Sequence, residues 1–151
     1  MQYLPLDLKI ALVSVFLQVG LTFFAMIRVA LLRVRAVKSG AAKIGDIALS
    51  SAHYPEAARR HGNNLANQFE FPVLLYVAVI LAAQFNVSSM PFALACLAYV
   101  VTRILHRFIH VTTNDVVQRF QVFLTGIVLL ALAWLFLIMG FFGVIAAAAQ
   151  G

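Results

Sequence analysis

The sequence predicts an all-α integral membrane protein, a four-transmembrane-helix bundle that forms one domain over residues 1–151. Hydrophobic residues make up 64% of the chain and charged residues only 11%, whereas an ordinary soluble domain is about 25% charged. The mean hydropathy is +0.98. The chain contains several long apolar stretches. Each is near or above roughly 20 residues, the length that a helix needs to cross about 30 Å of hydrocarbon. They predict helices at about residues 8–32, 62–85, 92–110 and 116–146.

The apolar stretch at residues 8–32 is expected to be a retained helix and not a signal peptide. Its start carries Asp7 and a single cation, Lys9. The apolar run is too long for the core of a signal peptide, and arginines follow it where a cleavage site of small residues would stand. The only substantial loop is then expected at about residues 33–60, where Gly40 and other helix breakers lie.

The second predicted helix opens with a polar stripe. Arg60, Asn64 and Asn67 are spaced i, i+4 and i+7, and Gln68 stands beside them. An unpaired amide in an apolar environment costs roughly 1–3 kcal/mol, so these amides must bond to one another, to neighbouring helices or to a ligand. Both interhelical bonding and a ligand site remain open for them. Pro72 lacks a backbone donor and predicts a kink just beyond this polar turn.

The third predicted helix closes on a basic cluster. Arg103, His106, Arg107 and His110 follow the spacing i, i+3, i+4 and i+7, which places all four on one stripe of a helix. Taken singly, an arginine near a helix end, such as Arg107, is usually a topology determinant that extends to the lipid headgroups. Taken together, the four form a cationic face that requires an anion.

A metal site is the other interpretation of this cluster. His106 and His110 have the i, i+4 spacing of metal ligands on one helical face. Arg103 and Arg107 share that face, however, and would repel a divalent cation. Hydrogen bonding to an anionic ligand therefore fits better, and we expect no metal.

Two short connections complete the predicted bundle. Residues 86–91 form a turn with a serine placed to cap the third helix, and residues 112–115 form a turn in which Asp115 lies at the positive end of the fourth. Every cation except Lys9 lies in or beside the first or the third inter-helix connection. By the positive-inside rule both connections are cytoplasmic, and both termini face the opposite side.

The net charge of +6 is therefore interpreted as membrane topology and contact with anionic headgroups. We expect no nucleic-acid partner, because the chain has no soluble basic module. Its partners would be the lipid bilayer and a lipophilic small molecule. The lone Cys96 excludes an intramolecular disulfide.

Two motifs on different predicted helices resemble those of one family. They are Arg60-x3-Asn64-x2-Asn67 ahead of Pro72, and Arg103-x2-His106-x3-His110 ahead of Arg119. With the length and the predicted topology, they are similar to the MAPEG family, the membrane-associated proteins in eicosanoid and glutathione metabolism. The second motif resembles the microsomal prostaglandin E synthase branch, while the short loop resembles uncharacterised bacterial members. The resemblance implies a homotrimer in a bacterial inner membrane.

The resemblance also implies an activity and a set of residues. It implies a membrane transferase or peroxidase that uses glutathione, or a related thiol, as co-substrate and acts on lipophilic electrophiles. Arg119 would be the catalytic residue that stabilises the thiolate. The residues implied to bind glutathione between neighbouring subunits are Arg33, Arg60, Asn64, Asn67, Gln68, Arg103, His106 and His110.

The sequence departs from the family pattern in three places. Asn67 stands where the family signature has a glutamate, with Glu70 one turn later, and Phe123 stands where the synthase branch has a tyrosine. The connection between the third and fourth predicted helices keeps neither the family's residues nor a second arginine. The alternative function is therefore a non-catalytic lipid-binding protein or accessory membrane subunit on the same fold.

Overall fold

The computed structural model describes residues 4–148, with the surroundings of the side chains described to residue 143. Every regular element in this part of the chain is helical. The elements are α1 (Leu6–Lys38), α2 (Ile44–Ile47), the 3-10 turn η1 (Ser51–His53), α3 (Glu56–Ala66), α4 (Pro72–Gln84), α5 (Met90–Val111) and α6 (Val116–Ala148). The two ends of the predicted domain, residues 1–3 and 149–151, lie outside the described residues.

Three of the described helices are long and apolar enough to cross a membrane. They are α1, α5 and the part of α6 from Val116 to Gly143. At 1.5 Å per residue each covers about 30 Å or more, the thickness of the hydrocarbon layer. The 13 residues of α4 are equally apolar but cover only about 20 Å. The chain is a multi-pass membrane protein.

The predicted continuous helix over residues 62–85 is wrong, because the structure divides it in two. α3 ends at Ala66 and α4 begins at Pro72. Between them the amides of Gln68 and Phe69 donate to carbonyls three residues back, at 3.0 and 2.9 Å, and so form tight turns. Proline is well suited to the first position of a helix, where its missing N–H leaves no bond unmade. Pro72 therefore starts a new helix where a kink was expected.

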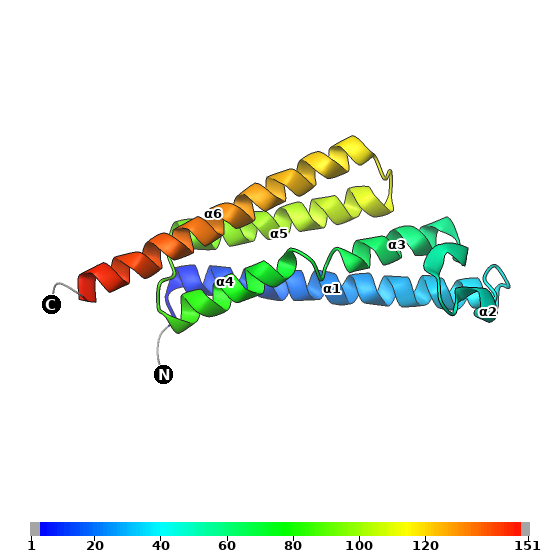
Figure 1. Ribbon diagram of the computed structural model, residues 1–151, viewed down its shortest axis with the longest axis horizontal. Helices are drawn as coiled ribbons and strands as arrows, with labels where there is room; N and C mark the ends of the chain where they lie inside the picture. The colour runs from blue at the N-terminus through cyan, green and yellow to red at the C-terminus, as the bar shows by residue number, and fades with distance from the viewer. Residues whose placement is uncertain (1–3, 149–151) are drawn as a thin grey trace.

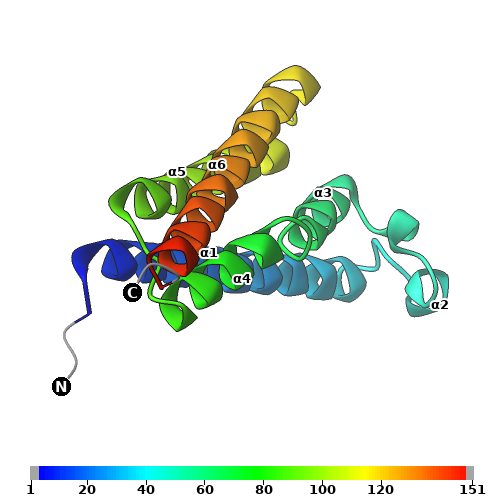
Figure 2. The ribbon, with the colours of Figure 1, turned by 60° about the vertical axis from the view of Figure 1, so that its left-hand side comes forward.

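The helices form two groups that are inclined to one another: the pair α5–α6 and the layer of α1, α3 and α4 (Figure 1, Figure 2). α3 and α4 follow one another along α1, and α5 packs between α1 and α6 (Figure 1). Turned by 60°, the α5–α6 pair is seen inclined to the layer of α1, α3 and α4 (Figure 2). The two connections beside which most of the cations lie, residues 39–55 and 112–115, are both at one end of the molecule, called the loop end below (Figure 1). The short connection from α4 to α5 lies toward the other end.

The core is formed where α4, α5 and α6 meet α1. Phe92 and Tyr99 of α5 and Leu130 of α6 are among its buried side chains. Small residues allow the helices to approach, since a Cβ added at Gly126 would lie 2.6 Å from the hydroxyl oxygen of Thr102. Large apolar side chains on the outer surfaces of the helices are exposed, as a surface that contacts lipid requires.

The predicted helix caps are confirmed. The hydroxyl of Ser89 accepts from the backbone N–H of Phe92 at 3.4 Å, at the start of α5. The carboxylate of Asp115 accepts from the N–H of Gln118 at 2.9 Å, at the start of α6. Each cap satisfies a backbone donor that lacks a partner inside its helix.

Candidate functional site

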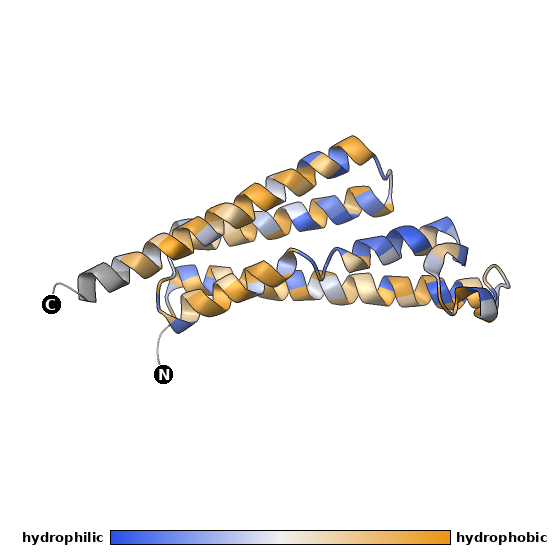
Figure 3. Cartoon of the chain, in the orientation of Figure 1, coloured by the Kyte–Doolittle hydropathy of each residue, from blue (hydrophilic) through white to orange (hydrophobic). Residues whose placement is uncertain are grey.

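Polar residues gather on α3 and on the half of α5 nearest the loop end (Figure 3). The predicted basic stripe of α5 lies there, and its four side chains are only 3–5% exposed. They are Arg103, His106, Arg107 and His110. The expectation that Arg107 extends freely from the helix end is therefore wrong. The residue faces the inside of the helix bundle, because α1 and α3 cover it.

Arg107 is held by an amide and by an aromatic ring. Its Nη1 donates to Oδ1 of Asn64, which is fully buried on α3. The guanidinium also lies 4.9 Å from the centre of the Phe24 ring of α1, in cation–π geometry. The charge is stabilised by dipoles and by an aromatic face, and among the described residues it has no carboxylate within ion-pair distance.

Arg103 ties α5 to the end of α3. Its Nη2 donates to the backbone carbonyl of Asn67 at 2.8 Å. Asn67 is the C-terminal cap of α3, where carbonyls without helical partners carry partial negative charge. Asn67 thus contacts the basic stripe through its backbone carbonyl, whereas the sequence pattern had drawn attention to its side-chain amide.

Gln68 takes part in bonding between helices. Its Oε1 accepts from Nε2 of Gln18 on α1 at 2.9 Å, and its own Nε2 donates to the backbone carbonyl of Asn64 at 3.2 Å. Gln18 and Gln68 are almost completely buried. Gln18 was not anticipated, although a lone glutamine in the middle of the first apolar stretch was the available signal.

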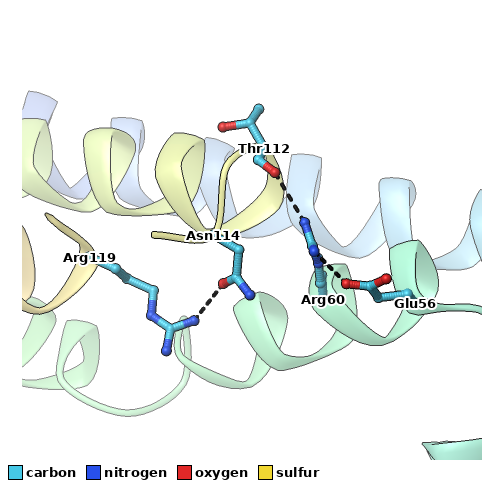
Figure 4. Close-up of polar contacts among 5 residues, drawn as sticks. All are labelled: Glu56, Arg60, Thr112, Asn114 and Arg119. Carbon is cyan, nitrogen blue, oxygen red and sulfur yellow. Dashed lines mark hydrogen bonds and ion pairs between the residues drawn. The ribbon is translucent and has the colours of Figure 1, made fainter. Parts of the chain in front are cut away.

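Arg60 and Arg119 both point to the turn between α5 and α6 (Figure 4). Arg60 donates to the backbone carbonyl of Thr112 at 3.1 Å and forms an ion pair with Glu56. Arg119 donates from Nη1 to Oδ1 of Asn114 at 2.7 Å. Two arginines from α3 and α6 therefore converge on one short turn at the loop end.

A cavity of about 220 Å³ connects Arg119 with the basic stripe. Its lining includes His106 of α5 together with Arg119 and Phe123 of α6. The ring of His106 lies 5.9 Å from that of Phe123 and 5.7 Å from that of His110. The cavity is thus a mostly apolar space with a cation and an imidazole at its border.

Several buried polar atoms of this region have no hydrogen-bond partner. They are Arg60 Nε, Asn64 Nδ2, Arg103 Nε, His106 Nδ1 and His110 Nδ1. Most of them are donors, and buried donors are normally satisfied. This set suits an anionic ligand that carries several oxygen acceptors.

The structure does not bring Arg33 into this cluster. Its guanidinium lies 5.1 Å from the centre of the Tyr54 ring, and its Nη2 would be 3.4 Å from a Cβ at Gly62. The side chain of Arg33, which belongs to α1, therefore packs against α3 and against the connection that joins the two helices. Among the described residues there is also no group of three or more His, Cys, Asp or Glu arranged to hold a metal.

Comparison with known proteins identifies one relationship. The sequence profile of the MAPEG family matches residues 11–139, which is most of the chain. No curated protein and no solved structure matches the chain. The matched segment includes α3, α4, α5 and the part of α6 that carries Arg119. The chain therefore belongs to the MAPEG family.

Proposed function

We propose that the protein is a membrane transferase or peroxidase that uses glutathione, or a related thiol, to act on lipophilic electrophiles. Membership of the MAPEG family supports glutathione-related chemistry at the level of the family. The observation that carries the proposal is the excess of buried donors around α5. Arg103, His106 and Asn64 each keep a polar atom without a partner, and His106 lines the cavity that Arg119 also lines.

The donor set fits glutathione. Bound there, glutathione would supply two carboxylates and a thiol as nucleophile. Arg60 and Arg103 would hold the carboxylates, since a guanidinium matches a carboxylate better than any other side chain. Asn64 would bond the peptide part, and His106 and His110 would donate further hydrogen bonds. Asn67 and Gln68 would border the same space from the end of α3.

Arg119 would act on the thiol. A fixed positive charge beside a thiol lowers its pKa from about 8.5 and so increases the fraction of thiolate at neutral pH. Arg119 is half-buried and shares its cavity with Phe120 and Phe123, whose rings would receive an apolar electrophile from the bilayer. The rate would come from the stabilised thiolate and from proximity, without a covalent protein nucleophile.

We further propose that the active form is a homotrimer of four-helix subunits, in which α4 and the end of α3 complete the fourth crossing. The loop end would face the cytoplasm of a bacterial inner membrane, with both termini on the opposite side. The position of Arg33 supports this assembly. It lies away from the α5 cluster of its own subunit, so it would serve the site of a neighbour.

Calorimetry with detergent-purified protein tests the proposal. We expect saturable heat when glutathione is titrated at millimolar concentration, weaker binding in Arg103→Gln, and loss of the ultraviolet absorbance of bound thiolate in Arg119→Ala. Arg35→Gln is the matched control, because Arg35 is exposed on α1 and lies outside both the site and the cavity. Absence of saturable heat in the wild type, with Arg119→Ala indistinguishable from it, would remove the thiol-dependent function.

One observation favours the alternative of a non-catalytic lipid-binding or accessory subunit. The amides of Asn64 and Gln68 are already used between helices, and Asn67 stands where the family has its glutamate. Co-purification of another membrane subunit, or of a lipid in the α5–α6 cavity, together with no thiol binding, would support this alternative.

A further inference from the structure

A second cavity, of about 450 Å³, lies on the other side of α5. Its lining comes from α1, α3 and α5 and includes Phe24, Arg28, His61, Ile104 and Arg107. On α5, position 104 lies nearly opposite position 106, which lines the α5–α6 cavity, and position 107 lies about a quarter of a turn from it. The two cavities share no lining residue. We call the second one the α1–α5 cavity.

The polar part of the α1–α5 cavity is basic and contains no acid. Arg107 is buried within it, Arg28 is exposed at its border, and His61 of α3 is buried beside them. Burial lowers the pKa of His61, and the charges of Arg107 and Arg28 lower it further. His61 is therefore a neutral donor at neutral pH, placed between two cations.

These cations lack an acidic partner in the described part of the chain. The one ion pair found there joins Arg60 to Glu56, and neither residue lines this cavity. Arg28 and Arg107 both lie within helices that can cross a membrane. Charges at such depth are costly unless paired, so an anion from outside the chain would stabilise them.

Part of the apolar lining of the cavity is on the side away from the loop end. α1 and α5 both run toward the loop end (Figure 1). Leu21 and Phe24 precede Arg28, and Ile104 precedes Arg107. These three apolar residues therefore lie deeper in the bilayer than the cation that follows each of them, whereas Phe108 and Val111 line the cavity on the loop-end side of Arg107. The cavity has the polarity of an amphiphile that has an anionic head at the loop end and an acyl chain toward the membrane centre.

We propose that the α1–α5 cavity binds an anionic phospholipid, with its phosphate between Arg28, His61 and Arg107. One acyl chain lies along Leu21, Phe24 and Ile104. The lipid supplies the counter-charge that the described residues lack, in the leaflet at the loop end, where anionic headgroups meet the cations beside the connections. This binding is separate from the thiol site, because the two cavities have different linings.

Native mass spectrometry of the full chain in a neutral detergent tests this assignment, with phosphatidylglycerol and phosphatidylcholine as probes. We expect one retained phosphatidylglycerol per subunit and no retained phosphatidylcholine. Arg28→Gln should weaken phosphatidylglycerol binding about fivefold, the effect of one cation near an anionic headgroup. Leu21→Trp should weaken it as well, because it fills the acyl-chain end without changing the charge.

Arg35→Gln is the matched control. It removes the same charge from an exposed position on the same helix, and we expect wild-type binding. An equal loss in Arg35→Gln, or equal retention of the two lipids, would show that net charge alone attracts them and would overturn the assignment. Displacement of the lipid by millimolar inorganic phosphate, with Leu21→Trp unaffected, would overturn it in favour of a free-anion site.

Discussion

At the scale of single residues, the buried charge of Arg107 depends on one amide. Asn64 is fully buried and accepts the hydrogen bond of Arg107 with its Oδ1. Replacing a hydrogen-bonded partner by an apolar group leaves the charged donor buried and unpaired, which costs about 1–3 kcal/mol or more. We therefore expect Asn64→Leu to lower the free energy of unfolding by about this amount, measured by denaturant titration in mixed micelles.

Asn63→Leu provides the comparison for this prediction. Asn63 precedes Asn64 in the same helix but is exposed, so its replacement should change the free energy of unfolding little. Equal effects of the two substitutions would mean that the bond to Arg107 contributes nothing measurable.

His61 predicts a pH dependence of stability. Its pKa in the folded protein is lowered from its usual value of 6.5 by burial and by the charges of Arg107 and Arg28; His110 of α5 also lies close enough to interact with it. The unfolded chain binds the proton more readily than the folded one. The free energy of unfolding is therefore expected to fall as the pH drops below about 6.5, and to gain nothing from His61 above it.

The measurement compares the free energy of unfolding of the wild type with that of His61→Gln in lipid-free detergent. The pH is varied from about 5 to about 7, the range in which histidine titrates. The wild type should lose more stability than the variant as the pH falls. Arg28→Gln should show an intermediate loss, because it removes one of the two charges that oppose protonation of His61. The same slope in wild type and His61→Gln would contradict the prediction.

At the scale of the elements, the contact of α5 with α6 depends on a glycine. A Cβ at Gly126 would lie 2.6 Å from the Thr102 hydroxyl oxygen, which itself donates to the carbonyl of Tyr99 at 2.6 Å. We expect Gly126→Ala to lower the free energy of unfolding by about 1–3 kcal/mol through overpacking. Thermal unfolding in detergent would detect the loss.

Two further substitutions identify the cause of that loss. Adding Thr102→Ala to Gly126→Ala removes the clashing oxygen and should restore part of the stability. Gly20→Ala adds the same methyl group inside a helix where nothing lies within 4 Å, so it should be neutral or stabilising. A double variant that is less stable than Gly126→Ala alone would locate the effect elsewhere.

The break between α3 and α4 has a structural role of its own. It frees the carbonyl of Asn67 to accept from Arg103, and it places Gln68 against Gln18 of α1. A continuous helix would have used the Asn67 carbonyl for its own ladder. The basic stripe of α5 and the break therefore depend on one another. The break leaves a carbonyl without a helical partner, and an arginine of the stripe donates to it.

At the scale of the whole molecule, the cations gathered near the loop end predict a sided insertion. Cys96 is fully buried, so the folded wild type should not react with a membrane-impermeant maleimide. In inverted inner-membrane vesicles Ser39→Cys, in the exposed first connection, should be labelled, while Gln84→Cys, exposed at the far end of α4, should not. Intact spheroplasts should give the reverse pattern. Labelling of both variants from the same side would refute this orientation.

The sequence by itself determined the environment of the protein and the helix ends that depend on local chemistry. Apolar length identified α1, α5 and α6, because a helix that crosses lipid must be apolar over its whole length. Ser89 and Asp115 marked the starts of α5 and α6, because a cap bonds only to residues a few positions away. Pattern and spacing also identified the MAPEG family, which the match over residues 11–139 confirms.

Only the tertiary structure decided which polar groups meet. The spacing of the α5 stripe was visible in the sequence, but it did not show that Arg107 and His106 line different cavities. Nor did it show that Gln68 bonds Gln18, fifty positions away. The physical reason is that a helical pattern fixes the direction of a side chain around its own axis, whereas the partner in that direction depends on how the other helices pack.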